Sequence, residues 1–211
     1  MKTRLPPRPD RRAFCRGAAA TALVAALPRA GAAAPFDLAQ LTALLAQRKS
    51  AQARFTEERY VGGLDGPLRA SGTLSYTAPD RFTRRTTEPL AETMSVEGNT
   101  VTLERAGRRR SMALDAVPEL TALIDGVRGT LSGNAALLQR HFETRVEGDA
   151  ALWTLKLTPR RTHGQVREIQ IAGTGGDLRS VELWLAGGDH SLMIVTPVPG
   201  AAAAASAPAA A

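Results

Sequence analysis

Cysteine is almost missing from this chain, because the 211-residue sequence has only one, Cys15, close to the N-terminus. A disulfide needs two cysteines, and thiolates are the ligands or nucleophiles of many zinc sites and enzymes. Beyond the N-terminal segment, the sequence therefore excludes disulfides, thiolate metal sites and a cysteine nucleophile. The stability of the folded part has to come from packing.

The N-terminal segment also lacks an apolar run long enough for a membrane anchor. Its run covers residues 17–27, whereas a helix needs roughly 20 residues to cross a bilayer. Residues 1–32 hold seven basic residues and one acid, and so carry six of the seven net positive charges of the chain. A basic stretch, a short apolar run and small residues are the layout of a secretory signal peptide. We predict that residues 1–32 are this peptide, with cleavage after Ala32 or, as the alternative, Ala33.

The export route has two readings. Arg11 and Arg12, followed by Phe14, are typical of twin-arginine signals, whose substrates cross the membrane folded. A general secretory leader rich in arginine is the alternative. Cys15 precedes the apolar run, so it is not placed like the acylated cysteine of a lipoprotein. Both routes predict an exported mature chain that begins near residue 33 without a thiol.

The net positive charge is small once the leader is set aside, since basic and acidic residues nearly balance and a net charge of +1 remains for the other residues. A nearly neutral domain is a poor match for the phosphate backbone of a nucleic acid, so no nucleic-acid partner is predicted. The exception is the run Arg108-Arg109-Arg110. We interpret it as a solvated strand edge, with contact to lipid phosphate or an acidic partner as the alternative.

Motifs for catalysis, metals or cofactors are also lacking. The histidines lie in separate segments, at His141, His163 and His190, and none belongs to an HExxH pair; no GxSxG pentapeptide occurs either. Residues 189–191, Asp-His-Ser, are contiguous, and neighbours on a strand face opposite sides, so we read them as a turn into a strand. Residues 173–176 read as a hairpin turn rather than a phosphate loop. We predict no catalytic residue, no metal and no cofactor.

Hydrophobic periodicity divides the mature chain into helical and extended segments. Residues 36–53 have leucines at helical spacing, and two more helical stretches follow, after Pro118 and at residues 135–140. The other segments alternate with a period of two between turn signals. The predicted strands are residues 53–61, 68–77, 81–86, 93–97, 100–104, 109–114, 143–147, 152–158, 165–172, 178–186 and 190–195.

Short strands in sequence order, interrupted once by helices, predict a mainly β fold of the α+β class. The expected form is a large curved antiparallel sheet or partial barrel with helices on one side. We assign residues 33–198 to this domain. The Ala- and Pro-rich residues 199–211 have almost nothing to bury and are expected to be a disordered tail.

One face of the predicted sheet is apolar. In residues 153–157, 169–171 and 181–185 the apolar side chains alternate with polar ones, so that one face is dry and the other is wet. This dry face could be a filled core beneath the helices or the wall of a ligand cavity. Aromatic residues make up 4% of the chain, and a wide curved sheet with few large side chains would fill incompletely.

Several short motifs, in this order, resemble those of the periplasmic outer-membrane lipoprotein carriers, the LolA-like family. The similarity runs over about residues 36–197. The motifs are the strand at residues 55–61, Ser71-Gly72-Thr73-Leu74, Pro79, Phe82, Thr87-Glu88-Pro89, residues 97–101 (EGNTV) and Leu157-Thr158-Pro159. The resemblance implies an unclosed antiparallel barrel of about eleven strands with a helical lid. It also implies an apolar interior that shelters acyl chains between the inner and outer membranes, without catalysis.

Candidate site residues follow from the alternating faces together with this resemblance. Apolar residues of the strands are expected to line the cavity: Leu74, Tyr76, Phe82, Met94, Val96, Leu103, Trp153, Leu155, Ile169, Ile171, Val181 and Leu183. Apolar helix residues are expected to form the lid: Leu41, Leu45, Leu120, Leu123 and Ile124. The expected partners are the acyl chains of a lipoprotein or another lipid, an inner-membrane donor protein and an outer-membrane acceptor protein, and we expect a monomer. The alternatives are a sensor or scaffold for a protein partner and an enzyme acting on an apolar substrate.

Two positions depart from the resemblance. The carriers commonly have an arginine before the proline that is Pro79 here, where it helps to hold the lid closed, and this chain has Ala78. Arg84 stands where the family often has an aromatic residue. These changes favour a specialised paralogue. Gly72 is expected to let a strongly bent strand curl with the sheet.

Overall fold

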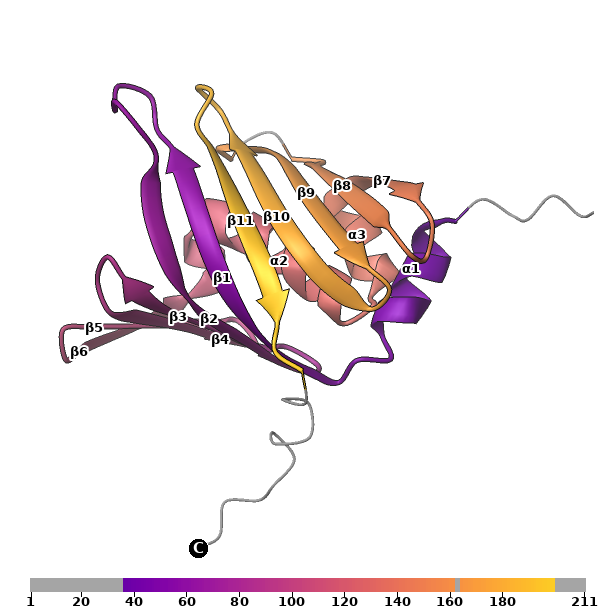
Figure 1. Ribbon diagram of the computed structural model, residues 1–211, viewed down its shortest axis with the longest axis horizontal. Coiled ribbons are helices and arrows are strands. Elements are labelled where there is room, and N and C mark those ends of the chain that lie inside the picture. Colours follow the sequence, from indigo (N-terminus) through magenta and orange to yellow (C-terminus); the bar gives the residue numbers. More distant parts are fainter. Residues whose placement is uncertain (1–35, 162–163, 200–211) are drawn as a thin grey trace, which may run out of the picture. The chain divides into compact units, whose positions relative to one another are not determined.

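Eleven strands form one antiparallel sheet in the computed structural model, which describes residues 36–161 and 164–199 (Figure 1). The strand order is β6-β5-β4-β3-β2-β1-β11-β10-β9-β8-β7. The first half consists of β1 (Ser50–Tyr60), β2 (Leu68–Thr77), β3 (Arg81–Glu88), β4 (Glu92–Glu97), β5 (Thr100–Arg105) and β6 (Arg108–Ala113). The second half consists of β7 (Phe142–Gly148), β8 (Trp153–Pro159), β9 (Val166–Thr174), β10 (Asp177–Leu185) and β11 (His190–Pro197). The predicted fold class and strand number are confirmed.

Two meanders meet at one pairing. Every neighbouring pair in the sheet is also consecutive in sequence except β1 and β11, which pair with Phe55 opposite Val195. β1 therefore lies between β2 and β11 and joins the two halves of the sheet. The predicted signal peptide, His163 and all of the predicted tail after Pro199 lie outside the described residues.

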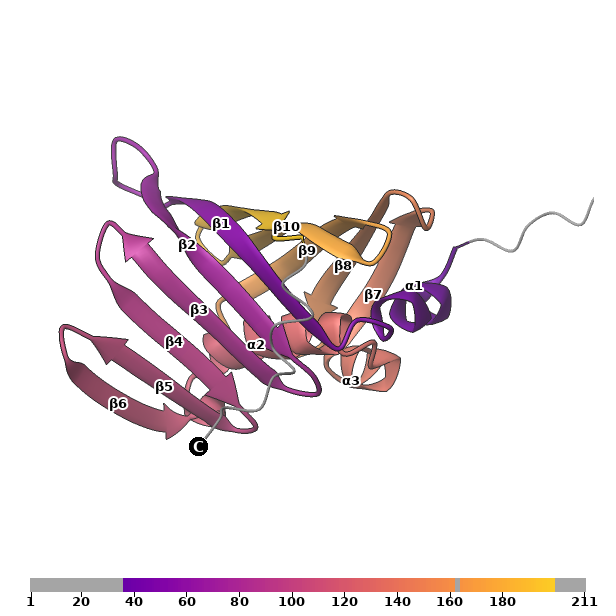
Figure 2. The ribbon, with the colours of Figure 1, turned by 60° about the horizontal axis from the view of Figure 1, so that its bottom comes forward.

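The helices all lie on the same side of the curved sheet, as the two ribbon views agree (Figures 1 and 2). They are α1 (Leu38–Leu45), the short 3-10 helix η1 (Leu114–Ala116), α2 (Pro118–Leu131) and α3 (Ala135–His141). The last three fill the connection between β6 and β7. Among the described helices, none combines the length and the apolar character needed to cross a membrane.

The first helix is shorter than the sequence predicts. It begins with a capping box, in which the Asp37 carboxylate accepts from the Gln40 N–H at 2.9 Å, and it ends at Leu45 instead of residue 53. β1 already begins at Ser50, and Ala53 pairs with both Leu74 and Pro197. Alanine-rich residues 51–53 carry a helical propensity that the pairing with two neighbouring strands outweighs.

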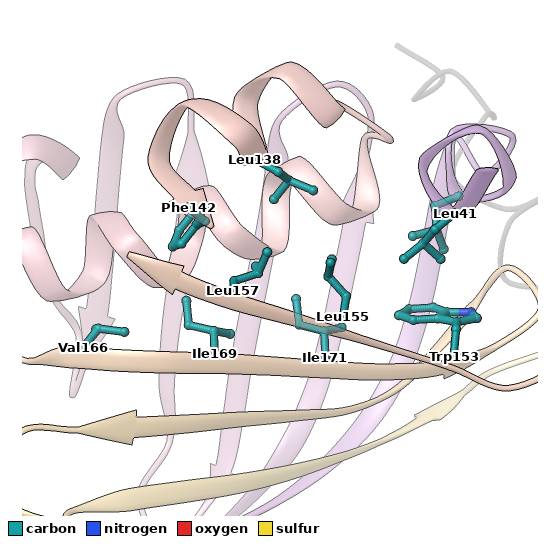
Figure 3. Close-up of a cluster of buried hydrophobic side chains, with 10 residues drawn as sticks. Leu41, Leu138, Phe142, Trp153, Leu155, Leu157, Val166, Ile169 and Ile171 are labelled. Atoms are coloured by element: carbon teal, nitrogen blue, oxygen red, sulfur yellow. The ribbon is translucent and has the colours of Figure 1, made fainter. Parts of the chain in front are cut away.

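A filled core occupies the part of the sheet formed by β7, β8 and β9 (Figure 3). Leu41 of α1 and Leu138 of α3 point toward the apolar face of these strands. The fully buried side chains there include Phe142, Trp153, Leu155, Leu157, Ile169 and Ile171. A second, smaller cluster consists of Val96, Val101, Leu114 and Ile124, beneath the start of α2. The buried aromatic rings of Phe142 and Trp153 belong to the first of these clusters, whereas those of Phe55 and Tyr76 lie on β1 and β2.

Gly126 lets α2 approach the sheet closely. A Cβ atom added there would lie 3.1 Å from Leu157 Cδ1 and 3.2 Å from Ile169 Cδ1, closer than ordinary van der Waals contact. A residue with a side chain would push α2 away from β8 and β9. The glycine thus fixes the distance at which the helix covers this part of the sheet.

Gly72 occupies a bulge between β2 and β3. The register of the two strands shifts between Ser71 and Gly72, and an added Cβ would lie 2.0 Å from the Arg85 carbonyl oxygen. Only glycine fits such an approach of two backbones. Because a bulge bends its strand and increases the local twist, this position agrees with the curl expected from the sequence.

Asp125 on α2 makes the stability of the fold depend on pH. Burial raises the pKa of its carboxyl group from the ordinary value of 3.8, against the smaller opposing effects of His141 and Arg128. The folded state therefore holds the proton more tightly than the unfolded state, and stability falls as the pH rises through the raised pKa. We expect Asp125→Asn to raise the free energy of unfolding at pH 7, by less than about 1 kcal/mol because the group is partly solvated.

Thermal unfolding of this variant at two pH values checks the expectation. Near pH 3 the carboxyl is protonated in both states, so Asp125→Asn and the unaltered protein should unfold at the same temperature. Asp65→Asn, in the exposed β1–β2 turn, is the matched control and should have no effect at either pH. An equal gain for Asp125→Asn at both pH values would attribute the effect to packing and contradict the prediction.

Candidate ligand-binding pocket

A pocket of about 490 Å³ lies beside the filled core, on the same face of the sheet. Its walls come from β1 to β4, from β10 and β11, and from α2. The apolar side chains around it are Ala51, Ala53, Leu74, Tyr76, Phe82, Met94, Leu123, Ile124, Val127, Leu131, Leu178, Val181, Leu183, Met193, Val195, Pro197, Val198 and Pro199. This volume is within the range of about 300–1,000 Å³ of small-molecule sites. The dry face of the sheet is thus a filled core at one end and a hollow at the other.

Half of the predicted cavity residues line this pocket. The six that do so are Leu74, Tyr76, Phe82, Met94, Val181 and Leu183. They come from four strands, and the register places Leu74 opposite Arg84 and Arg84 opposite Met94. The structure therefore brings together residues from both halves of the sheet.

The other six predicted cavity residues lie away from the pocket. Trp153, Leu155, Ile169 and Ile171 are in the filled core, where all four are fully buried. Val96 belongs to the cluster at the start of α2, and the partly buried Leu103 packs against that cluster. These positions lie in or against the packed clusters beneath the helices and do not line this pocket, so their contact with a ligand stays a prediction. Alternation identifies the dry face of a strand but not what covers it.

Of the predicted lid residues, too, some line the pocket and others lie in or against the packed clusters. Leu123 and Ile124 of α2 line the pocket, whereas Leu41 and Leu45 of α1 are in the filled core and Leu120 packs against the cluster beneath α2. Sequence reasoning missed Val127 and Leu131 of the same helix. These two continue the stripe of Leu123 and Ile124 at helical spacing, so the signal was present in the sequence. On the strands, Met193 and Val195 were missed, because their neighbours Leu192 and Ile194 are apolar as well and β11 shows no clear alternation between apolar and polar residues.

Side-chain bonds hold α2 over this site. Arg128 Nη2 donates to the Gly98 carbonyl oxygen at 2.8 Å, and Thr121 Oγ1 donates to the Leu114 carbonyl oxygen at 2.6 Å. Ala78, where the resemblance led us to expect an arginine, contributes a backbone bond, with its N–H donating to the Lys49 carbonyl oxygen at 2.8 Å. Arg128 thus links α2 to the turn between β4 and β5.

Tyr76 places a phenol at the wall of the pocket. Its hydroxyl donates to the Pro79 carbonyl oxygen at 3.3 Å. Burial raises the pKa of Tyr76, and the negative charge of Asp80 raises it further. The phenol therefore stays neutral at physiological pH and adds no charge to the wall.

Charged groups are concentrated at two places in the lining. Arg84 Nη2 lies 2.5 Å from Glu57 Oε2, and the Arg84 guanidinium is 4.6 Å from the centre of the Phe55 ring. Arg48 Nη2 lies 2.7 Å from Asp177 Oδ1. All other charged lining residues are arginines, Arg59 and Arg179.

The described histidines occupy structural positions. His190 stacks between Tyr60 and Trp184, with ring centres 4.5 Å and 4.8 Å away, and Asp189 Oδ1 accepts from the Gly62 N–H at 2.9 Å. His141 ends α3. Within residues 36–161 and 164–199, no group of three or more His, Cys, Asp or Glu side chains is placed to hold a metal ion. Arg108, Arg109 and Arg110 are exposed on β6, the last strand of the sheet, as predicted for a solvated edge.

These features define a class: open antiparallel half-barrels in which helices cover the concave face over an apolar pocket. The chain belongs to the outer-membrane lipoprotein carrier (LolA-like) family, whose model matches residues 30–211. It is 31% identical over 195 residues to an outer-membrane lipoprotein carrier protein of Cupriavidus pinatubonensis, covering 87% of this chain and 85% of the relative. It is 30% identical over 168 residues to that of Cupriavidus necator, covering 74% of each.

Among solved structures, a LolA superfamily protein from Nitrosomonas europaea is similar with a TM-score of 0.42 and 11% identity. The match covers 75% of this chain and 89% of that one. The family expected from the sequence motifs is therefore confirmed by the family model and by the relatives.

Proposed function

We propose that this protein is a periplasmic carrier that shelters an acyl chain of a lipoprotein or another lipid in the pocket and transfers it toward the outer membrane. The supporting observation is the pocket of about 490 Å³, lined mainly by aliphatic side chains. Burial of one methylene group is worth about 0.8 kcal/mol. Burial in an apolar hollow of this size can therefore offset the free energy that it costs a hydrocarbon chain to leave a membrane.

Release of the cargo requires the cover to open. In this proposal α2 is the lid, because its apolar stripe forms one wall and Arg128 ties it to the turn between β4 and β5. One hydrogen bond to a charged donor contributes about 1.5–3 kcal/mol, which is weak enough to break during transfer. The action is binding and release without catalysis, between a donor protein at the inner membrane and an acceptor at the outer membrane.

Extraction of lipid from the protein purified from the periplasm tests this function. We expect native mass spectrometry to detect the protein with bound lipid, and the delipidated protein to take up the neutral fluorescent probe N-phenyl-1-naphthylamine. Absence of lipid together with no uptake of the probe would contradict the carrier function. Capture of one protein partner by the lipid-free protein would then favour a sensor or scaffold, and turnover of an apolar substrate would favour an enzyme.

A further inference from the structure

A charged pair lies inside the apolar pocket, where an acyl chain needs none. The side chains of Glu57 and Arg84 are 8% and 22% exposed, and both line the pocket. A buried ion pair is costly to desolvate and is weak evidence for a contribution to stability. We therefore look for the role of this pair in ligand binding and not in the stability of the fold.

The geometry directs Arg84 across the floor of the pocket. Arg84 belongs to β3, while Glu57 and Phe55 belong to β1, so the side chain crosses β2 to reach them. The residue of β2 paired with Phe55 is Gly72, which has no side chain to block the crossing. The guanidinium is held between the face of the Phe55 ring and the Glu57 carboxylate, with other donors of its planar group still available.

The charges of the lining do not balance. Glu57 has a second cation within reach, because Arg59 Nη2 lies 3.9 Å from its other oxygen, Oε1. At the second charged place, Arg48 and Arg179 share one carboxylate, Asp177, at 2.7 Å and 4.0 Å. The pocket thus presents four arginines and two carboxylates. Arg84 is the most buried of the four, since Arg48, Arg59 and Arg179 are 39%, 54% and 48% exposed. Guanidinium groups favour an anion with planar or tetrahedral oxygens.

We propose that the ligand of this pocket is an anionic amphiphile whose acidic head, a carboxylate or a phosphate, pairs with Arg84. The inference rests on the proposed function, since the hydrocarbon chain is held by the apolar walls. When the head binds, Glu57 turns to Arg59, so that neither the carboxylate nor the guanidinium is left unpaired. Arg84 is then the residue that determines specificity.

Competition against the neutral probe N-phenyl-1-naphthylamine tests this inference on the delipidated protein. The competitors are dodecanoate, dodecyl phosphate and dodecanol, which share one chain and differ in the head. We expect at least one of the two acids to displace the probe at a concentration about tenfold lower than dodecanol does, the scale of one charge-assisted hydrogen bond. The stronger of the acids identifies the head group.

Variants assign the preference to Arg84. In Arg84→Gln the acids should compete no better than dodecanol, while dodecanol itself competes as before. Arg85→Gln is the matched control, because Arg85 is the next residue of β3 and is exposed on the other face. The double variant Glu57→Gln with Arg84→Gln leaves no buried charge unpaired, because the other partner of Glu57, Arg59, is 54% exposed. It replaces the single variant if that one does not fold.

The outcomes separate this inference from the function on which it rests. Displacement of the probe by all three competitors at equal concentrations would overturn the anionic ligand and leave the carrier function standing. A preference for acids that persists in both Arg84 variants would also overturn it. If neither the probe nor any of the chains binds, the carrier function itself fails.

Discussion

Replacing Met193 with tryptophan is expected to weaken binding of an apolar probe more than about tenfold, or ~1.4 kcal/mol, without lowering the stability of the fold. Met193 of β11 lines the pocket, opposite Glu57 on β1 and Val181 on β10, and does not belong to either packed cluster. The larger ring would occupy part of the 490 Å³ that the ligand needs. Filling a hollow adds buried apolar area at about 25 cal/mol per Å² instead of straining packed neighbours.

Titration with N-phenyl-1-naphthylamine and thermal unfolding measure the two parts of this prediction. Ile194→Trp is the matched control, because Ile194 is the next residue of the same strand, is 46% exposed and faces away from the pocket. It should bind the probe like the unaltered protein. Unchanged probe binding in Met193→Trp would place the ligand elsewhere, and a large loss of stability would mean that the space is already filled.

Replacing Trp153 with alanine is expected to lower the free energy of unfolding by about 3–5 kcal/mol. The side chain is fully buried in the filled core, and its Nε1 donates to the Gly175 carbonyl oxygen at 2.8 Å. Its ring also packs against Gly173, where an added Cβ would lie 2.2 Å from it. The change leaves a cavity and an unpaired acceptor, and the total stability of a native protein is only about 5–15 kcal/mol.

Urea unfolding followed by circular dichroism measures this loss. Trp184→Ala is the matched control, since the chain has two tryptophans and Trp184 is 42% exposed on the outer face. We expect it to cost less than about 1 kcal/mol. If the alanine variant does not fold, Trp153→Phe replaces it. This variant keeps an aromatic ring, so its free energy of unfolding should fall by less. Equal losses for Trp153→Ala and Trp184→Ala would be inconsistent with a core that depends on Trp153.

The strands were predictable because their signals are local. Alternation between turn residues gave eleven strands, and each hairpin pairs neighbours in sequence. The first helix shows where local signals end: residues 51–53 have helical propensity, but Ala53 lies between β2 and β11. The pairing of β1 with β11 joins segments more than a hundred residues apart, and no local pattern reports it.

Only half of the predicted cavity residues line the pocket, because helix packing, like the pairing of β1 with β11, is not a local property of the sequence. Leu74 and Leu155 are both apolar residues on alternating strands, yet Leu74 lines the pocket and Leu155 is fully buried in the core. The difference is made by the helices, since α1, α2 and α3 pack over β7 to β9. Similarly, Arg84 is visible in the sequence as a departure from the family, but its pairing with Glu57 depends on the crossing over β2.

The sequence by itself determined the class of fold, the family and the absence of cysteine beyond Cys15, because composition, periodicity and motif order are properties of the chain. Only the tertiary structure decided where the apolar face is filled and where it is hollow, because that depends on which helix covers which strand. It also decided that a glutamate and an arginine from different strands meet inside the hollow. Packing across the sheet, and not local pattern, makes this half-barrel a candidate binding site.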